Sequence, residues 1–239
     1  MMNAIKTPAK ILVNFALGLL SANQRRHLKE YFELKFWKQL HQEHAKTQEE
    51  LERERAHYQY FFTEFFNLPL QHYRGKRVLD IGCGPMGSLE WANEAAERVG
   101  LDPLAEKYLE LGASKHAMKY VNAPSEKIPF PAGHFDVVAT LNSLDHVEDV
   151  NQTISEIKRV TAPGGYVLLI SEMDHQPTFT EPHKLDRSVL TLFEPEFAQD
   201  DVRYFGERED HQIYKSLTDK VPYVPGERGI LCARLKRRA

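Results

Sequence analysis

The sequence predicts an α/β protein built on a doubly wound, mostly parallel sheet. Short, almost continuously apolar strands alternate with helical segments after Arg74, which is typical of a parallel sheet covered on both faces. A glycine-rich turn at residues 82–87 directly follows the first of these strands. Two late apolar segments lie close enough in sequence to pair antiparallel at the sheet edge.

Each expected element follows from the apolar pattern. The main strands are expected at residues 77–81, 98–101, 119–121, 135–141 and 165–171. The two late strands are expected at residues 202–205 and 229–235. Helices are expected at residues 88–97, 104–111, 150–160 and 185–193.

The part of the chain before Arg74 has a different composition. Residues 24–66 are rich in Glu, Lys, Gln, Arg and aromatic side chains without a proline, so we expect two or three helices there. Residues 47–55 are strongly polar and predict an exposed helical face. An aromatic cluster then predicts packing on the next domain: Tyr58, Tyr60, Phe61, Phe62, Phe65 and Phe66. We therefore expect an N-terminal helical extension or lid, residues 1–73, and a ligand-binding sheet domain, residues 74–239.

An apolar segment at residues 11–20 is about half the length needed to span a bilayer. Its large side chains recur at helical spacing, so we expect a helix that packs on the domain or on a second subunit, which would make a homodimer. Association with a membrane surface and a cleaved signal peptide remain as alternatives. No stable insertion into a membrane is expected.

The composition of the chain argues against nucleic-acid binding and against a cysteine-based metal or redox site. The 239 residues carry a net charge of −3, which gives no general attraction to nucleic acid, and no nucleic-acid partner is expected. The two cysteines, Cys83 and Cys232, lie far apart and form no metal or redox pattern. Their scarcity favours a reducing, cytoplasmic location.

The glycine-rich turn carries the strongest chemical signal. Gly82, Gly84 and Gly87 follow a strand and match the spacing G-x-G-x-x-G, which on its own is a weak indication of a dinucleotide. Glycine allows positive φ and close approach of a ligand to the backbone. Asp80 stands inside the strand, two positions before the first glycine. A carboxylate there disfavours a pyrophosphate and favours a cationic ligand such as a sulfonium-bearing amino acid.

The segment LDIGCGPMG resembles motif I of the class I S-adenosylmethionine-dependent methyltransferases, of the type 11 group, and the likeness runs from about Gly75 to Val167. This resemblance implies a Rossmann-like fold and S-adenosyl-L-methionine as the methyl donor. It implies that donor contacts come from the first strand and turn, at Asp80, Gly82, Cys83, Gly84 and Gly87.

Further segments resemble the same family. Asp102, followed by Pro103, matches the acidic residue that grips the ribose hydroxyls, although Asp-Pro also begins helices. Residues 125–130 resemble the adenine-side loop, which places Ser125 and Glu126 near the adenine. Pro124 stands where the family has an acidic residue, so the adenine amino group must rely on Glu126 or on backbone.

The loop after the fourth strand, from Asn142 to Val147, is expected at the methyl end of the donor. Because an O- or N-acceptor can need a proton removed, histidines near this loop are candidate catalytic groups. They are His146, which the neighbouring Asp145 should make more basic, and His175 and His183 after the fifth strand. Each of them also fits a structural role.

The same loop resembles that of ubiquinone-biosynthesis O-methyltransferases, which carry acidic-x-x-acidic-His and can hold a divalent cation. Asn142 replaces the first acidic residue, and two remaining ligands make a weak site, so no metal is expected.

The acceptor is expected to be a small molecule, such as a sugar or another metabolite. No Asn-Pro-Pro-aromatic motif follows the fourth strand, which argues against amino-methyltransferases of adenine, cytosine or glutamine. Two other classes remain open. They are a nicotinamide-dependent oxidoreductase and a protein that binds S-adenosylmethionine without catalysis.

Overall fold

A computed structural model describes residues 21–42 and 47–239. The chain forms two compact units, Met1–His44 and Ala45–Ala239. The first contributes the 21-residue helix α2, Ala22–Gln42. The helix expected at residues 11–20 lies outside the described residues.

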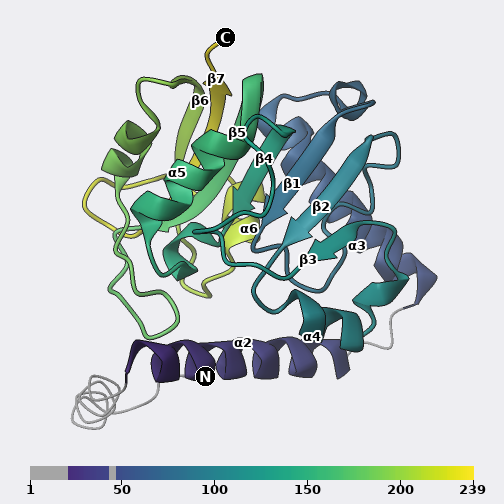
Figure 1. Cartoon of the computed structure of the whole chain (residues 1–239). Helices are drawn as coiled ribbons and strands as arrows, with labels where there is room; N and C mark the ends of the chain where they lie inside the picture. The colour runs from purple at the N-terminus through teal and green to yellow at the C-terminus, as the bar shows by residue number, and fades with distance from the viewer. Residues whose placement is uncertain (1–20, 43–46) are drawn as a thin grey trace, which may run out of the picture. The chain divides into compact units, whose positions relative to one another are not determined.

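The second unit contains a seven-stranded sheet (Figure 1). Its strand order is β3-β2-β1-β4-β5-β7-β6. In chain order the strands are β1 Arg77–Ile81, β2 Glu97–Leu101, β3 Lys119–Val121, β4 Phe135–Leu141, β5 Thr161–Met173, β6 Phe197–Gly206 and β7 Gly229–Arg237. The expected Rossmann-like, mostly parallel sheet is confirmed.

The two late strands pair antiparallel, as expected, and β7 lies between β5 and β6. Strand β7 is antiparallel to both neighbours, whereas strands β1 to β5 pair with one another only in parallel. The carboxyl ends of β1, β2 and β4 therefore meet at one edge of the sheet, where ligands bind in open α/β folds.

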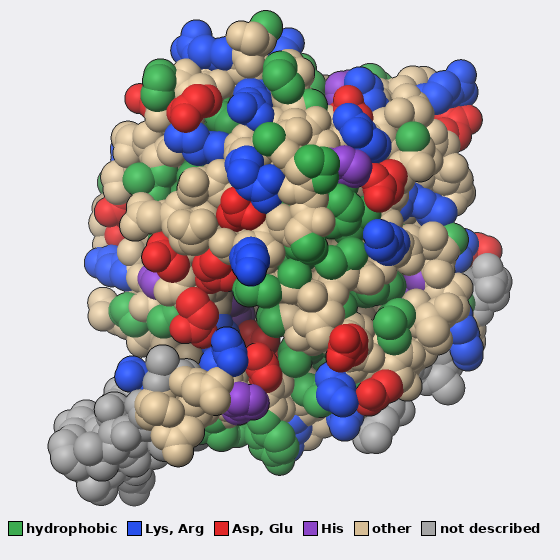
Figure 2. Space-filling view, viewed as in Figure 1, with side chains coloured by type: hydrophobic (Ala, Val, Ile, Leu, Met, Phe, Trp, Pro, Cys, Tyr) green, Lys and Arg blue, Asp and Glu red, His purple; other side chains and the backbone are tan. Residues whose placement is uncertain are grey.

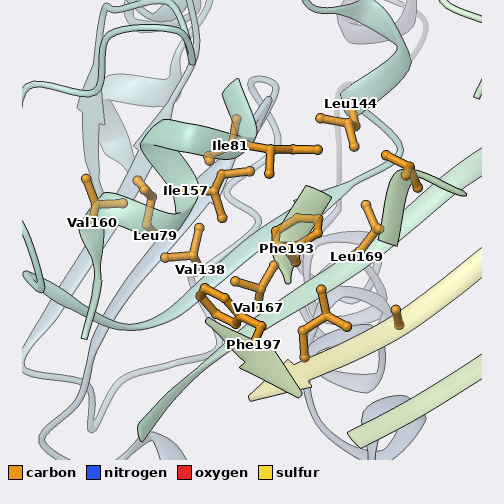
Figure 3. Close-up of a cluster of buried hydrophobic side chains, with 14 of the residues drawn as sticks. Leu79, Ile81, Val138, Leu144, Ile157, Val160, Val167, Leu169, Phe193 and Phe197 are labelled. Carbon is orange, nitrogen blue, oxygen red and sulfur yellow. The ribbon is translucent and has the colours of Figure 1, made fainter. Parts of the chain in front are cut away.

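Helix α5, Val150–Val160, covers one face of the sheet (Figure 1). Asp149 caps its start by accepting a hydrogen bond from the Gln152 amide. Ile157 and Val160 point into the apolar layer between helix and sheet, together with Leu79, Val138 and Val167 (Figure 3). This layer fixes α5 beside the strand ends that carry the candidate site.

The other face is covered by α3, Gln48–Phe62, and by α6, Ile213–Thr218 (Figure 1). Helix α3 begins with the polar stretch that was expected to be an exposed helical face. Thr47 and Glu50 form a reciprocal capping box at its start. The end of α3 supplies buried aromatic rings that pack against the sheet strands.

The domain boundary expected at residue 73 differs from the division between the two compact units, at residue 44. Phe61, Phe62, Phe65 and Phe66 are all buried in the layer beneath the sheet. Arg203 and Arg234, from β6 and β7, donate hydrogen bonds to the carbonyls of Phe65 and Phe66. Residues 45–73 are therefore part of the sheet unit.

The helix expected at residues 88–97 is wrong: this stretch forms turns. The side chains of this stretch form hydrogen bonds that do not belong to a helix. Ser88 donates to Asp80, the indole of Trp91 donates to the Ser88 carbonyl, and Glu90 accepts from the Met118 amide. Such side-chain hydrogen bonds compete with helix formation.

The remaining elements are short. Helix α4, Ala105–Glu110, follows β2, and the helix expected at residues 185–193 is a 3-10 helix, η6, at Arg187–Phe193. Other 3-10 helices are η2 Glu64–Phe66, η3 Leu70–Tyr73, η4 Ala113–Lys115 and η5 Leu144–His146.

Figure 2 shows acidic and basic side chains interspersed over the face in view. Across residues 21–42 and 47–239, no helix has the length and apolar character needed to cross a membrane.

Candidate active site

The glycine-rich turn begins directly at the end of β1. Gly82, Gly84 and Gly87 all have positive φ, at 72°, 58° and 74°, a region that L side chains rarely adopt. A Cβ built on Gly82 would lie 2.4 Å from the Cβ of Ser143, so the turn also touches the loop after β4. Ser143 ties the two together by donating a 2.7 Å hydrogen bond to the Ile81 carbonyl.

Asp80 is buried in β1, 4% exposed, just before this turn. Its carboxyl accepts a 2.5 Å hydrogen bond from the Ser88 hydroxyl. Burial, and to a smaller extent the nearby Asp102, raise the pKa of Asp80 to about 7 against the opposing effect of the Ser88 hydrogen bond. The site thus holds a carboxyl that would gain from a positively charged ligand.

Asp102 follows β2 and is 7% exposed. Its Oδ1 accepts from the Leu104 amide at 2.8 Å, and its Oδ2 lies 3.4 Å from the Gly84 amide nitrogen. Helix α4 begins later, with Leu104 as its N-cap, so Asp102 is not the cap of that helix. The two backbone contacts fix the carboxylate beside the glycine turn.

The loop after β3 contains the expected adenine-side residues. Ser125 is buried, and its hydroxyl lies 3.0 Å from that of Thr153 on α5. The Glu126 carboxylate accepts from the amides of Glu148 and Asp149, at 2.7 and 3.0 Å. Glu126 therefore binds the start of α5, which favours backbone over its side chain as the adenine contact.

The loop after β4 carries polar atoms without partners. Asn142 has a positive φ of 61°, and its buried Oδ1 accepts no hydrogen bond from the described residues. Asp145 is fully buried, and its Oδ1 is likewise without a hydrogen-bond donor in that part of the chain. His175 faces Asp145 Oδ2 at 3.4 Å, but Oδ1 has no partner, and a polar ligand that donates to it would remove the cost of burying it.

The three candidate catalytic histidines lie in different surroundings. His175 is buried, with its Nε2 3.4 Å from Asp145 Oδ2, and the proximity of Asp145 raises the pKa of His175 to about 9. His183 Nε2 lies 2.8 Å from the Val147 carbonyl. His146 is half-buried at the end of η5. His175 carries a proton at neutral pH, so it is poorly suited to remove one.

A second cluster of charges lies at the end of β5, and the sequence did not indicate it. Arg228 donates to Glu172 Oε1 at 3.0 Å, and its Nε lies 2.9 Å from Glu207 Oε2. Burial raises the pKa of Glu172 to about 7, with Glu207, Asp145 and Glu181 adding to the rise and Arg228 opposing it. These residues are scattered between Asp145 and Arg228, so only the folded chain brings them together.

Two tyrosines that the sequence did not assign to a site, Tyr214 and Tyr58, lie near the strand ends. The Tyr214 hydroxyl on α6 donates to the carbonyl of Leu141, the last residue of β4, at 3.3 Å. Tyr58 on α3 is close enough to Tyr214 and Asp80 that both raise its pKa, after burial, which raises it most. The signal available in the sequence was the aromatic cluster at the end of α3.

Most expected contact residues therefore gather at the carboxyl edge of β1, β2 and β4. Cys83 is buried against β2, since a Cβ on Gly100 would lie 2.6 Å from its Sγ. Pro103 is exposed beside Asp102. The described residues contain no group of three His, Cys, Asp or Glu side chains arranged to hold a metal ion.

Comparison with known proteins agrees with this geometry. A family model described as a methyltransferase domain matches residues 79–169. An uncharacterized methyltransferase of Schizosaccharomyces pombe is 37% identical over 129 residues, which cover 48% of this chain and 46% of that protein. The malonyl-[acyl-carrier protein] O-methyltransferase of Enterobacter lignolyticus is 31% identical over 143 residues, 52% of this chain and 57% of its own. The chain thus matches about half the length of these curated relatives.

The fold also resembles solved structures. Geranyl diphosphate C-methyltransferase from Streptomyces coelicolor, crystallised with Mg²⁺, geranyl diphosphate and S-adenosyl-L-homocysteine, aligns with a TM-score of 0.55. The alignment covers 81% of this chain and 85% of that chain at 16% sequence identity, which shows a shared fold.

Proposed function

We propose that this chain, which belongs to the class I S-adenosylmethionine-dependent methyltransferases, transfers the methyl group of S-adenosylmethionine to a small-molecule acceptor. The observation that supports this most is the pair of buried carboxyls, Asp80 and Asp102, on either side of the glycine-rich turn. Asp80 and Asp102 disfavour each other's charge, and a ligand with an amino group and a sulfonium relieves that repulsion.

The residues present fit this donor. In the positive-φ turn, Gly82 is exposed, so a ligand can approach its backbone closely, while Gly84 is buried and its amide faces Asp102. Asp102, held by two backbone contacts, would accept hydrogen bonds from both ribose hydroxyls. The unpartnered Oδ1 of Asn142 is an acceptor for the amino group of the methionine portion. Ser125 and neighbouring backbone would contact the adenine.

Catalysis then depends mainly on positioning. The donor, when bound, supplies an activated methyl group, and the protein has to hold the acceptor in line with it. The loop from Asn142 to His146 is fixed to the turn after β1 through Ser143. We assign His146, the half-buried histidine of this loop, to contact the acceptor. His175 and His183 hold the neighbouring loops through Asp145 and the Val147 carbonyl.

Calorimetric titration tests the donor assignment. We expect S-adenosylhomocysteine to bind and NAD to give no heat, because Asp80 disfavours a pyrophosphate. Binding of NAD without any response to S-adenosylhomocysteine would support the oxidoreductase alternative instead. A protein that binds the donor but transfers no methyl group to any acceptor in a broad screen would be the non-catalytic alternative.

The cellular location, the partners and the oligomeric state of the protein are part of the same proposal. We infer a cytoplasmic protein with no nucleic-acid partner, on the basis of the two free, buried cysteines and the net charge of −3. A homodimer through the N-terminal helices is testable by light scattering.

A further inference from the structure

The carboxyl cluster at the end of β5 lies beside the proposed donor site. Leu141 of β4 pairs with Ile170 of β5, and Glu172 follows two residues later on the same face of the sheet. Asp80 shares that face, since Val78, Leu168 and Ile170 all belong to the apolar layer beneath it. Only β4 separates β1 from β5, so the two strands lie about 10 Å apart.

The cluster contains more carboxyl groups than cations. Asp145, Glu172, Glu181 and Glu207 interact there, and the facing cations are Arg228 and His175. Arg228 is shared between Glu172 and Glu207, and His211 Nδ1 lies 2.6 Å from Glu207 Oε1. Such a site repels an anionic acceptor and attracts a cationic one.

A separate observation indicates a ligand at this cluster. Asp145 is fully buried and lies near Glu172; its Oδ2 faces His175 Nε2 at 3.4 Å, whereas its Oδ1 has no hydrogen-bond donor among the described residues. An ammonium group offers three donors and a positive charge, which a hydroxyl or carboxylate does not. The rings of Tyr58 and Tyr214 lie on the same side of the sheet and suit a methylated cation.

We propose that this cluster binds the amino group of a small aliphatic amine, and that Glu172 takes the proton which the nitrogen must lose. This inference rests on the proposed methyl transfer and names its acceptor class. The bound ammonium first gives one N–H proton to the Glu172 carboxylate, which Arg228 holds in place through its other oxygen. The lone pair that this frees on nitrogen then forms a bond to the methyl carbon while the carbon–sulfur bond breaks and its electron pair stays on sulfur, which leaves a methylammonium product and neutral S-adenosylhomocysteine.

The test uses matched acceptors with the 239-residue chain. Benzylamine, benzyl alcohol and benzoate share one skeleton, as do putrescine, 1,4-butanediol and succinate. Binding of each is measured by calorimetry in the presence of saturating S-adenosylhomocysteine, and turnover is measured as S-adenosylhomocysteine release. We expect at least one of the two amines to bind and react at least about tenfold better than its partners.

Glu172→Gln separates the proton-transfer role from a structural one. Glutamine keeps an acceptor for Arg228 but is not a base, so kcat with the preferred amine should fall about a hundredfold or more while S-adenosylhomocysteine affinity is kept. In the wild type, kcat should rise with pH near 7 as the Glu172 carboxyl ionises. This rise should disappear in the Glu172→Gln variant. Glu196→Gln removes a carboxylate that pairs with Lys158 at 2.7 Å, outside the cluster, and should leave both measurements unchanged.

Some results overturn the inference alone. If S-adenosylhomocysteine binds but neither amine binds or reacts, or if the alcohols or acids are preferred, the amine assignment is wrong. A folded Glu172→Gln protein with wild-type kcat and pH profile removes Glu172 from catalysis. Should that variant fail to fold, the wild-type preference among matched acceptors still decides the acceptor class. Failure of S-adenosylhomocysteine itself to bind would instead contradict the proposed function.

Discussion

At the scale of single residues, Asp102 has the most sharply defined role. Asp102→Ala should weaken S-adenosylhomocysteine binding by about 1.5–3 kcal/mol, because a charged acceptor for the ribose hydroxyls is lost. Calorimetry on the folded variant gives the value. Asp186 is a matched control, since its Oδ1 accepts from the Ser188 amide two residues on, as Asp102 does from Leu104. Asp186→Ala should cost stability without changing affinity, and equal affinity in both variants would exclude Asp102 from the site.

Asp80 links donor binding to pH. Its pKa of about 7 lies above the unfolded value, so between about pH 4 and 7 the folded protein binds more protons than the unfolded chain. This group therefore lowers the stability of the ligand-free protein as pH rises through that window. A cationic ligand favours the ionised carboxylate, so affinity for S-adenosylmethionine should increase from pH 6 to pH 8.

The neutral variant Asp80→Asn tests whether ionisation of Asp80 causes the pH dependence of affinity. It should lose the pH dependence of affinity and bind more weakly at pH 8, where the wild-type carboxylate is ionised. Thermal melting of the ligand-free variant should show a smaller loss of stability between pH 5 and pH 8 than the wild type. A wild-type affinity that stays constant from pH 6 to pH 8 would contradict the role given to Asp80.

At the scale of elements, the turn after β1 and the loop after β4 form one unit. Gly82→Ala should destabilise the protein by about 3 kcal/mol, because its Cβ would overlap Ser143 and its φ is positive. In a Ser143→Gly background the overlap is gone, so the same substitution should cost only about 1 kcal/mol. Urea denaturation of the four proteins measures the coupling; equal costs in both backgrounds would mean that the two loops move apart freely.

The elements also show where sequence reasoning works. Strands such as β1 and β4 were predicted at their observed bounds, because buried parallel strands are almost continuously apolar. Residues 88–97 have ordinary helical composition, yet Ser88 and Glu90 bond to β1 and to the Met118 amide instead. Glu172 and Arg228 lie in unremarkable local sequence, and only tertiary contacts make them part of a site. The positions of the motif residues could be predicted from the sequence, but the residues that they contact in the folded chain could not.

At the scale of the whole molecule, the aromatic residues before β1 should be indispensable. A fragment of residues 45–239 should unfold in one cooperative transition and bind S-adenosylhomocysteine, because it retains the complete sheet unit. A fragment of residues 74–239 loses Phe61, Phe62, Phe65 and Phe66, all buried against the sheet, and should not fold. Circular dichroism melts distinguish the two, and a cooperative transition in the shorter fragment would contradict the packing described.

The place of β7 in the sheet has a consequence for biosynthesis. Strand β6 hydrogen-bonds to β7, and β7 in turn joins it to β5. A ribosome delivers β6 before β7, so β6 has no partner in the sheet until residues 229–237 have emerged. During that interval the nascent chain exposes the side of β5 that β7 will cover, an open strand edge prone to association with other chains. Chaperone contact during translation should therefore be strongest in the period between synthesis of β5 and release of β7.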